Sequence, residues 1–213
     1  MNPVFMVADQ GSESWQSLKL GVLSGSNISR ALAKKGTETR STYMDELIGQ
    51  IATRKFDEIN AKSLDYGKVN EVAARAAFEF ETGHKVQQVG FIYSGDDKRM
   101  GVSPDGIMPS LKKGLELKCP ITAKVHVKFL RSEIMKPEYF YQVQFSLYVS
   151  QYETWDFASF NPSFKANMLK VLTVEKDPKT FERFDNELPE FLKEMDTELE
   201  KLGLKFGNQW GKE

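Results

Sequence analysis

The sequence is poor in cysteine, in net charge and in long hydrophobic runs. Only one of its 213 residues, Cys119, is a cysteine, so no disulfide can form within the chain and a reducing, cytoplasmic compartment is expected. No apolar stretch is long enough to cross a bilayer. The first residues, MNPVFMVADQ, lack the basic and apolar regions of a signal peptide. We therefore expect a cytoplasmic protein with no membrane partner.

The charges nearly cancel. The chain carries 29 Lys and Arg against 30 Asp and Glu, which gives a formal net charge of −1. A strongly basic surface is excluded, and this disfavours a protein that coats nucleic acid without specificity. A nucleic-acid enzyme stays open, because its lysines and arginines need to cluster only locally. With 40% hydrophobic and 12% aromatic residues, the chain can bury a sizeable core.

No repeat, low-complexity tract or linker divides the chain, so we expect a single domain of ordinary size over 1–213. Apolar spacing and capping residues predict helices near 12–21, 23–36, 42–56, 65–82, 138–152 and 178–202. Short apolar or alternating runs predict strands over 86–94, 98–106, 114–120, 155–161 and 168–177. This order predicts an α/β (α+β) domain with a mixed central β-sheet flanked by helices.

Two of the predicted helices carry further detail. In the helix over 65–82, one stripe of apolar residues predicts the packed face, namely Val69, Val72, Ala73, Ala76, Ala77 and Phe80. Glu71 lies off that stripe, on the side shared with Arg75 and Phe78. In the last helix, Pro189 is expected to introduce a kink or a break.

The most informative motif is SPDG, which contains Asp105, followed by GLELKCP, which contains Glu116 and Lys118. Residues two apart on a strand point to the same face, so Glu116 and Lys118 should project together while Leu117 and Cys119 face the core. A hairpin would bring Asp105 beside them. Two carboxylates and one ammonium group would then meet at one edge of the sheet.

This trio suits metal-dependent hydrolysis of a phosphodiester. Mg²⁺ and Mn²⁺ prefer oxygen ligands, and Mg²⁺ usually takes one or two carboxylates together with waters and phosphate oxygens. One or two such ions would lower the pKa of a bound water, and Lys118 would orient that water or the phosphate. A simpler interpretation is an exposed hairpin with a surface Glu116–Lys118 pair, in which P-D-G is only a favoured turn.

In this order the motifs resemble the PD-(D/E)xK nuclease superfamily and, within it, the lambda exonuclease or YqaJ-type viral recombinase family. The resemblance runs from WQSLKLG nearly to FGNQW, and it includes LKLGVLSGS, NAKSLDYGK, FEF, SPDG, GLELKCP, QVQFSLYV and LPEFLKEMD. It implies a PD-(D/E)xK restriction-endonuclease-like core. It also implies 5′-to-3′ digestion of one strand of linear double-stranded DNA to 5′-mononucleotides, which leaves a 3′ single-stranded overhang for recombination.

The resemblance implies cellular context as well. It points to a phage or prophage enzyme in the cytoplasm of a bacterial host cell. The assembly it implies is a homotrimer that encloses the DNA. The expected partners are double-stranded DNA ends and a single-strand-annealing recombinase that loads on the exposed strand.

The resemblance also assigns roles at the centre of the site. It places the metal ligands at Asp105, Glu116, Glu71 and the carbonyl of Leu117. Lys118 and Gln142 would position water and phosphate, with Gln144 the weaker candidate of the two glutamines. Glu71 can equally be a solvated helix charge or a partner of Arg75, and Gln142 can be a buried polar residue that bonds the backbone.

Three further residues are assigned to the DNA end. Ser26 matches a serine of a 5′-phosphate pocket, and a helix N-terminus at this position would favour an anion, although Ser26 can also be a plain N-cap. Lys19 stands where the lambda enzyme has an arginine, and a lysine offers charge without a bidentate fork. Leu64 matches an apolar wedge that helps to separate the terminal base pair, and it can equally belong to the core.

Two other functions are weighed against the exonuclease. A sequence-specific endonuclease of the same superfamily would need base-reading loops, for which the chain has no obvious insertion. A DNA-end-binding module without activity would have a degenerate site, whereas Asp105, Glu116 and Lys118 are all present. The remaining reactive residues have plainer roles: His84 and His126 are expected at the surface, and Cys119 as a buried structural thiol.

Overall fold

The computed structural model describes residues 2–56 and 62–211, without the side chains of 62–68. Its strands are β1 (Val4–Met6), β2 (Leu23–Ser24), β3 (Phe91–Tyr93), β4 (Met100–Val102), β5 (Gly106–Met108), β6 (Lys113–Lys118), β7 (Thr154–Phe160) and β8 (Leu169–Glu175). Its α-helices are α1 (Glu13–Lys19), α2 (Ile28–Ala31), α3 (Glu38–Thr53), α4 (Lys62–Thr82), α5 (Ala123–Ser132), α6 (Pro137–Ser150) and α7 (Pro178–Lys201). Short 3₁₀ turns are η1 (Gly25–Asn27), η2 (Pro109–Leu111) and η3 (Asn208–Trp210).

The strands form two four-stranded sheets, in the orders β1-β3-β4-β2 and β5-β6-β7-β8. Both sheets are mixed, because β2 runs parallel to β4 and β6 runs parallel to β7, while the other pairs are antiparallel. A single bridge between Gln87 and Ile107 connects the segment before β3 to β5. The structure thus confirms the mixed α/β class and divides the strands between two sheets.

Helices cover both faces of the β5-β6-β7-β8 sheet. On one face, Ala74 and Phe78 of α4 pack with side chains of β6 and β7, which are Leu115, Leu117, Ala158 and Phe160. On the other face, Phe157 of β7 lies 5.2 Å from Phe129 of α5 and 5.7 Å from Tyr139 of α6, measured between ring centroids. The carboxyl end of β6 therefore lies between α4 and the pair α5 and α6.

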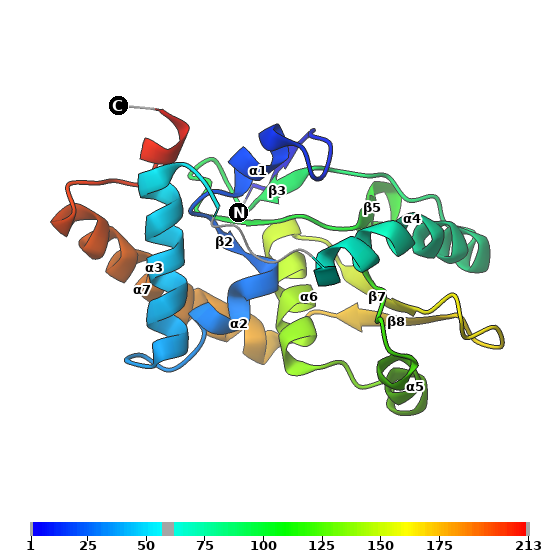
Figure 1. The fold of residues 1–213 in the computed structure, drawn as a ribbon. Coiled ribbons are helices and arrows are strands. Elements are labelled where there is room, and N and C mark those ends of the chain that lie inside the picture. Colours follow the sequence, from blue (N-terminus) through cyan, green and yellow to red (C-terminus); the bar gives the residue numbers. More distant parts are fainter. Residues whose placement is uncertain (1, 57–61, 212–213) are drawn as a thin grey trace.

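The helix α6 lies at the middle of the molecule (Figure 1), with α3 and α7 on one side and α5, β7 and β8 on the other. Its residues from Val143 to Ser150 are all buried, which confirms the prediction of a buried helix. Phe145 packs edge-on against Phe184 of α7 at 5.6 Å. The helix α7 continues through Pro189, so of the predicted kink or break the break does not occur.

The predicted packed face of α4 is wrong. Val69, Val72 and Phe80 are 77%, 71% and 90% exposed, whereas Ala74 and Phe78 are fully buried. The small Ala74 lets the helix approach β6, and the side that carries Glu71 and Arg75 faces the loop before β5. Periodicity shows that a helix has an apolar stripe, but which face is buried depends on the elements that pack against the helix.

Several short elements differ from their sequence predictions. The helix expected over 23–36 is instead β2, η1 and the one-turn helix α2. Strands β1 and β5 and helix α5 were not predicted. Among the described residues, no helix is long and apolar enough to cross a membrane.

Candidate active site

The hairpin of β5 and β6 brings the SPDG and GLELKCP motifs together. Gly106 pairs with Leu115 across the hairpin, and the backbone N–H of Asp105 donates to the carbonyl of Leu115 at 3.2 Å. Glu116 and Lys118 point to the α6 face, opposite to Leu117, as the strand pattern predicts. The hairpin prediction is confirmed, and it places Asp105 at the carboxyl end of β6.

Three polar side chains form a closed network at this point. Lys118 Nζ lies 2.6 Å from Glu116 Oε1 and donates to Gln142 Oε1 at 3.2 Å. Gln142 Nε2 completes the triangle by donating to Glu116 Oε1 at 2.7 Å. Glu116 is only 4% exposed, so its carboxylate depends on these two donors in place of water.

The two glutamines of α6 have different surroundings. Gln142 binds Glu116 and Lys118, so its amide belongs to the polar network and not to the backbone. Gln144 is fully buried, donates to the carbonyl of Glu175 at 2.8 Å and accepts from the N–H of Asp177 at 2.9 Å. Gln144 therefore ties α6 to the segment between β8 and α7, and its role is structural.

Asp105 is a carboxylate in a negatively charged setting. Desolvation and then the charge of Glu116 raise the pKa of Asp105 well above its usual value, and Glu71 adds to the increase. The charge of Lys118 and a hydrogen bond from the N–H of Leu117, at 2.6 Å, act in the opposite direction. Asp105 is half-buried, so its carboxylate is within reach of a small ligand from solvent.

Lys118 stays protonated although its side chain is largely buried. Desolvation alone would lower its pKa, but the charges of Glu116 and Asp105 and the hydrogen bond to Glu116 outweigh it, and the pKa is raised. Its Nζ also lies 4.8 Å from the ring centroid of Tyr139, a cation–π contact that favours the charged form. Lys118 is therefore a fixed positive charge beside two carboxylates.

Glu71 reaches the site from the other face of the sheet through Arg75. Arg75 Nη2 lies 2.5 Å from Glu71 Oε1, and Arg75 Nε donates to the carbonyl of Asp105 at 3.2 Å. Glu71 is thus a partner of Arg75, and it is also close enough for its charge to raise the pKa of Asp105. Arg75 holds α4 against the Asp105 loop, a role that sequence analysis did not assign.

No group of three histidine, cysteine or acidic side chains among the described residues is arranged to hold a metal ion. Two carboxylates, from Asp105 and Glu116, meet at the carboxyl end of β6. A divalent ion there would depend on water or substrate oxygens for its remaining ligands.

The residues assigned to the DNA end lie on separate elements. Ser26 is exposed in η1, next to Gly25, where an added Cβ would lie 3.6 Å from Cγ of Gln142. Ser26 is the second residue of the short 3₁₀ helix η1, whose N-cap is Ser24, so Ser26 is not an N-cap itself. Ser26 is thus placed near the polar network, because its neighbour Gly25 lies against Gln142.

Lys19 ends α1, and its Nζ lies 3.1 Å from the ring centroid of Trp15. Trp15 Nε1 donates to Ser103 Oγ of the SPDG motif at 2.9 Å, so α1 is anchored beside the Asp105 loop. Leu64 falls in the first turns of α4, and its side chain lies outside the described residues.

The remaining reactive side chains are structural. His126 is fully buried, with hydrogen bonds of 2.8 Å to Ser159 Oγ and to the carbonyl of Asn167, so its expected surface position is wrong. The ring fills a polar space between α5 and β7 that sequence spacing does not reveal. Desolvation raises the pKa of the half-buried Cys119 to about 11, which leaves it a protonated thiol and a poor nucleophile.

Comparison with known proteins gives a family and a set of similar structures. Residues 14–153, which include every candidate site residue, match the family model of the YqaJ-like viral recombinase domain. LHK-Exo, an alkaline exonuclease from Laribacter hongkongensis, is 30% identical with a TM-score of 0.82 over 90% of this chain and 96% of LHK-Exo. A structure of LHK-Exo in complex with dAMP has the same TM-score and coverage at 29% identity.

Two further proteins are similar over different extents. A phage-related exonuclease from Haemophilus somnus 129PT has a TM-score of 0.65 at 11% identity, over 85% of this chain and 96% of that one, which shows a common fold. The protein ExoD of Escherichia coli (strain K12) is 37% identical over 78 residues, which are 37% of this chain and 90% of ExoD.

Proposed function

The chain belongs to the family of YqaJ-like viral recombinases and alkaline exonucleases, and from this premise we propose that it degrades one strand of linear double-stranded DNA. Digestion runs from the 5′ end, releases 5′-mononucleotides and leaves a 3′ overhang for recombination. One observation carries the proposal: Asp105, Glu116, Lys118 and Gln142 converge at the carboxyl end of β6. The dAMP held by LHK-Exo is a mononucleotide, the class of product proposed here.

The donor set fits a divalent ion that keeps several water or phosphate ligands. Asp105 and Glu116 offer carboxylates. Burial and then the charge of Glu116 raise the pKa of Asp105, and a bound cation would favour the ionised form of both groups. We assign Mg²⁺, with Mn²⁺ as a substitute and two ions in each site, to these carboxylates, Glu71 and the carbonyl of Leu117. When bound, the ions supply Lewis-acid activation of water and offset negative charge on the phosphate.

The protein side chains supply position and charge around the scissile phosphate. Lys118 presents a fixed ammonium group, which stabilises the negative charge that develops on the phosphate oxygens. Gln142 holds both Glu116 and Lys118 in place, and we assign its amide to a position beside the scissile phosphate. Because these groups are already hydrogen-bonded to each other, little rearrangement is needed before reaction.

The DNA end is assigned to the side of the site formed by α1 and η1. Ser26 offers a hydroxyl next to the Gln142 side of the network, and Lys19 offers a positive charge at the end of α1. A 5′-terminal phosphate held there would fix the next phosphodiester in register with the carboxylates. Leu64 is proposed as the wedge at the terminal base pair.

Assembly as a homotrimer and loading of a single-strand-annealing recombinase complete the proposal. Val69, Val72 and Phe80 form an exposed apolar stripe on α4, and apolar surface of this kind marks interaction sites. Light scattering of this 24.3 kDa chain should give the mass of three copies. A stable monomer at working concentrations would defeat the ring and leave processive digestion without a structural basis.

A sequence-specific endonuclease is the main competing function, and circular DNA separates the two. An exonuclease needs an end, so linear duplex should be degraded with Mg²⁺ while covalently closed circles of the same sequence stay intact. Cutting of closed circles at a fixed position would establish the endonuclease. Binding of linear duplex without any degradation in Mg²⁺ or Mn²⁺ would establish an inactive end-binding module.

A further inference from the structure

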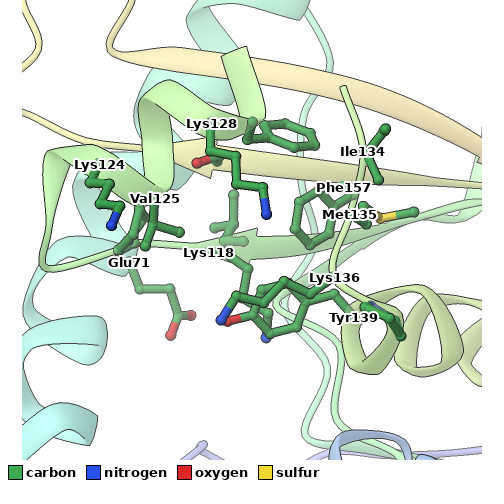
Figure 2. A pocket seen from close by; sticks show the side chains of 16 residues that line it. Glu71, Lys118, Lys124, Val125, Lys128, Ile134, Met135, Lys136, Tyr139 and Phe157 are labelled. Atoms are coloured by element: carbon green, nitrogen blue, oxygen red, sulfur yellow. The ribbon is translucent and has the colours of Figure 1, made fainter. Parts of the chain in front are cut away.

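The cavity that opens beside Lys118 belongs to the proposed active site. It measures about 760 Å³, and Figure 2 shows Lys124 and Lys128 of α5 and Tyr139 of α6 among its lining residues. A different cavity, of about 360 Å³, lies between the end of α2, the start of α3 and the helix α7. In Figure 1 these three helices lie on the side of α6 opposite to α5. We call it the Arg40 cavity, and it contains none of the residues assigned so far.

Positive charge is in excess in the Arg40 cavity. Its charged lining residues are Lys34, Lys35, Arg40, Arg183, Glu187 and Glu190. Glu187 is occupied by Arg183, whose Nε and Nη2 donate to its two carboxylate oxygens at 2.8 and 3.1 Å. Outside the lining, Glu194 serves two cations at once, because it lies 2.7 Å from Lys35 Nζ and 3.0 Å from Arg40 Nη2. The cations therefore outnumber the carboxylates that pair with them.

Two of these cations have bonding capacity left over. Lys34 is exposed and forms no ion pair with any residue that the structure describes. The side chain of Arg40 is only 8% exposed, and its Nη1 is buried without a hydrogen-bond partner among the described residues. A buried polar group without a partner costs free energy, and a bound anion would supply the partner. Because Arg40 lines the cavity, rotation of its guanidinium group would present Nη1 to an anion there.

The chemistry of these donors favours a phosphate group. A guanidinium group presents N–H donors in a planar fork that matches two phosphate oxygens, and a lysine adds a point charge. Arg40 lies in the first turn of α3, where the helix dipole also favours negative charge. The cavity adjoins the helix that carries the active-site network, since Arg183 Nη1 donates to the hydroxyl of Tyr141 at 2.7 Å and Tyr141 directly precedes Gln142.

We infer that the Arg40 cavity binds a phosphate group, with Arg40 and Lys34 as its main ligands. The inference goes beyond the proposed exonuclease function and does not depend on it. The phosphate has two possible sources with the same chemistry. One is the backbone of bound DNA, because α2 follows directly on η1, where the 5′ end is proposed to bind. The other is free phosphate, either inorganic or carried by a released mononucleotide.

The first test measures binding of inorganic phosphate to the Lys19→Ala protein, without DNA or divalent metal. This background removes the lysine proposed for the 5′-terminal phosphate. At constant ionic strength, Tm should rise with phosphate and then level off, because a ligand that binds only the folded state stabilises it. Chloride should give no such rise. Equal Tm values in phosphate and chloride would overturn the inference.

Substitutions of exposed charges in the same background locate the site. Lys34→Gln should weaken phosphate binding about three-fold, as expected for the loss of one exposed charge. Glu190→Gln should tighten it about three-fold, because it removes a negative charge from the lining. Lys193→Gln is the control, since Lys193 is an exposed lysine of α7 outside the lining, and it should change nothing. Unchanged phosphate affinity in both Lys34→Gln and Glu190→Gln would contradict the inference.

Arg40→Met tests the buried ligand. It should weaken phosphate binding at least about ten-fold, because hydrogen bonds to charged groups contribute more than neutral ones. Glu194 keeps Lys35 as its partner in this variant. Arg40→Lys keeps the charge and should restore part of the binding. A phosphate-dependent rise in Tm of full size in Arg40→Met would contradict the inference, and if Arg40→Met does not fold, Lys34→Gln and Glu190→Gln decide.

The source of the phosphate follows from DNA binding in Ca²⁺, which should support binding with little cleavage. If the DNA backbone occupies the cavity, Lys34→Gln in the otherwise unmodified protein should lower the slope of log affinity against log salt by about one, and Lys193→Gln should not. An unchanged slope together with weakened phosphate binding would identify free phosphate as the ligand. If the slope and the phosphate affinity are both unchanged in Lys34→Gln, the inference is wrong, whereas the proposed exonuclease function is unaffected.

Discussion

Two groups of candidate residues differ in how they are held. The β6 cluster, consisting of Asp105, Glu116, Lys118 and Gln142, is fixed by hydrogen bonds among its own members and to the β6 backbone. The 5′-end pair, Lys19 and Ser26, lies on short elements nearer to solvent. A preorganised cluster acts on the chemical step itself, whereas a surface pair acts by placing the substrate. The two groups should therefore fail in different ways when they are mutated.

The largest effects should come from the β6 cluster. Asp105→Asn, Glu116→Gln or Lys118→Met should each lower kcat by a factor of about a hundred or more, because each removes a charge that acts on the reacting phosphate. Release of acid-soluble nucleotides measures the rate, and circular dichroism checks the fold. A near-normal kcat in any one of these variants would remove that residue from the cluster and weaken the contrast with the 5′-end pair.

The two glutamines of α6 test which residues belong to the β6 cluster. Gln142→Ala should slow digestion with little loss of stability, since Glu116 keeps its bond to Lys118. Gln144→Ala leaves the carbonyl of Glu175 and the N–H of Asp177 without their partner, so it should cost about 1–3 kcal/mol of unfolding free energy. Thermal melts and initial rates on both variants check this, and the opposite pattern would exchange the two roles.

A third comparison uses metal and pH. The folded-state pKa of Asp105 is raised by desolvation and by Glu116, so the folded protein binds more protons than the unfolded chain between the ordinary and raised values. Without metal, the contribution of Asp105 to stability is therefore present at low pH and falls as pH rises through that window. Asp105→Asn should remove this loss, and the variant should be relatively more stable than the unmodified protein at alkaline pH.

Mg²⁺ should restore the stability that is lost at alkaline pH only in proteins that keep the Asp105 carboxylate. At ten times its dissociation constant, a bound ion stabilises the folded state by about 1.4 kcal/mol. Thermal unfolding at alkaline pH should therefore show a rise in Tm with Mg²⁺ for the unmodified protein and little rise for Asp105→Asn. Lys19→Ala, from the 5′-end pair, should respond as the unmodified protein does. Equal rises in all three proteins would argue against an ion at the β6 cluster.

Sequence analysis could locate the β6 cluster, because strand geometry fixes which residues share a face. Glu116 and Lys118 are two apart on one strand, and a hairpin turn is enough to bring Asp105 to them. The face of α4 could not be found in this way, since its apolar stripe points to solvent and Arg75 turns Glu71 toward the Asp105 loop. Helical periodicity shows that apolar residues gather on one side of a helix, but it does not show which side packs against the rest of the protein.

The cavity beside Lys118 was also beyond sequence analysis. Its walls come from α5, from the segment after α5, and from strands and helices distant in the chain. Lysines such as Lys124 and Lys128 look like ordinary solvated charges until the fold places them beside Lys118. The position of His126 depends in the same way on a tertiary contact, its hydrogen bond with Ser159.

The smallest effect should come from the 5′-end pair. If Lys19 and Ser26 bind the terminal phosphate, 5′-phosphorylated duplex should be digested faster than 5′-hydroxyl duplex. Lys19→Ala should erase that preference more than it slows hydroxyl-ended DNA, and raised salt should weaken it. Lys19→Arg should keep or sharpen the preference, because a guanidinium group can contact two phosphate oxygens. If the unmodified protein digests 5′-phosphorylated and 5′-hydroxyl duplex at equal rates, Lys19 and Ser26 do not bind the terminal phosphate. The role proposed for the β6 cluster would not be affected by that result.

The most direct measurement of the central claim follows the order in which labels leave a linear duplex. One strand carries a label on its 5′-terminal nucleotide or, in a second preparation, on its 3′-terminal nucleotide, and products are resolved by length with and without Mg²⁺. We expect the 5′ label to appear at once as a mononucleotide, the 3′ label to stay in long fragments until late, and neither to be released without metal. Early release of the 3′ label, or release of the 5′ label in long fragments, would contradict a 5′-to-3′ exonuclease.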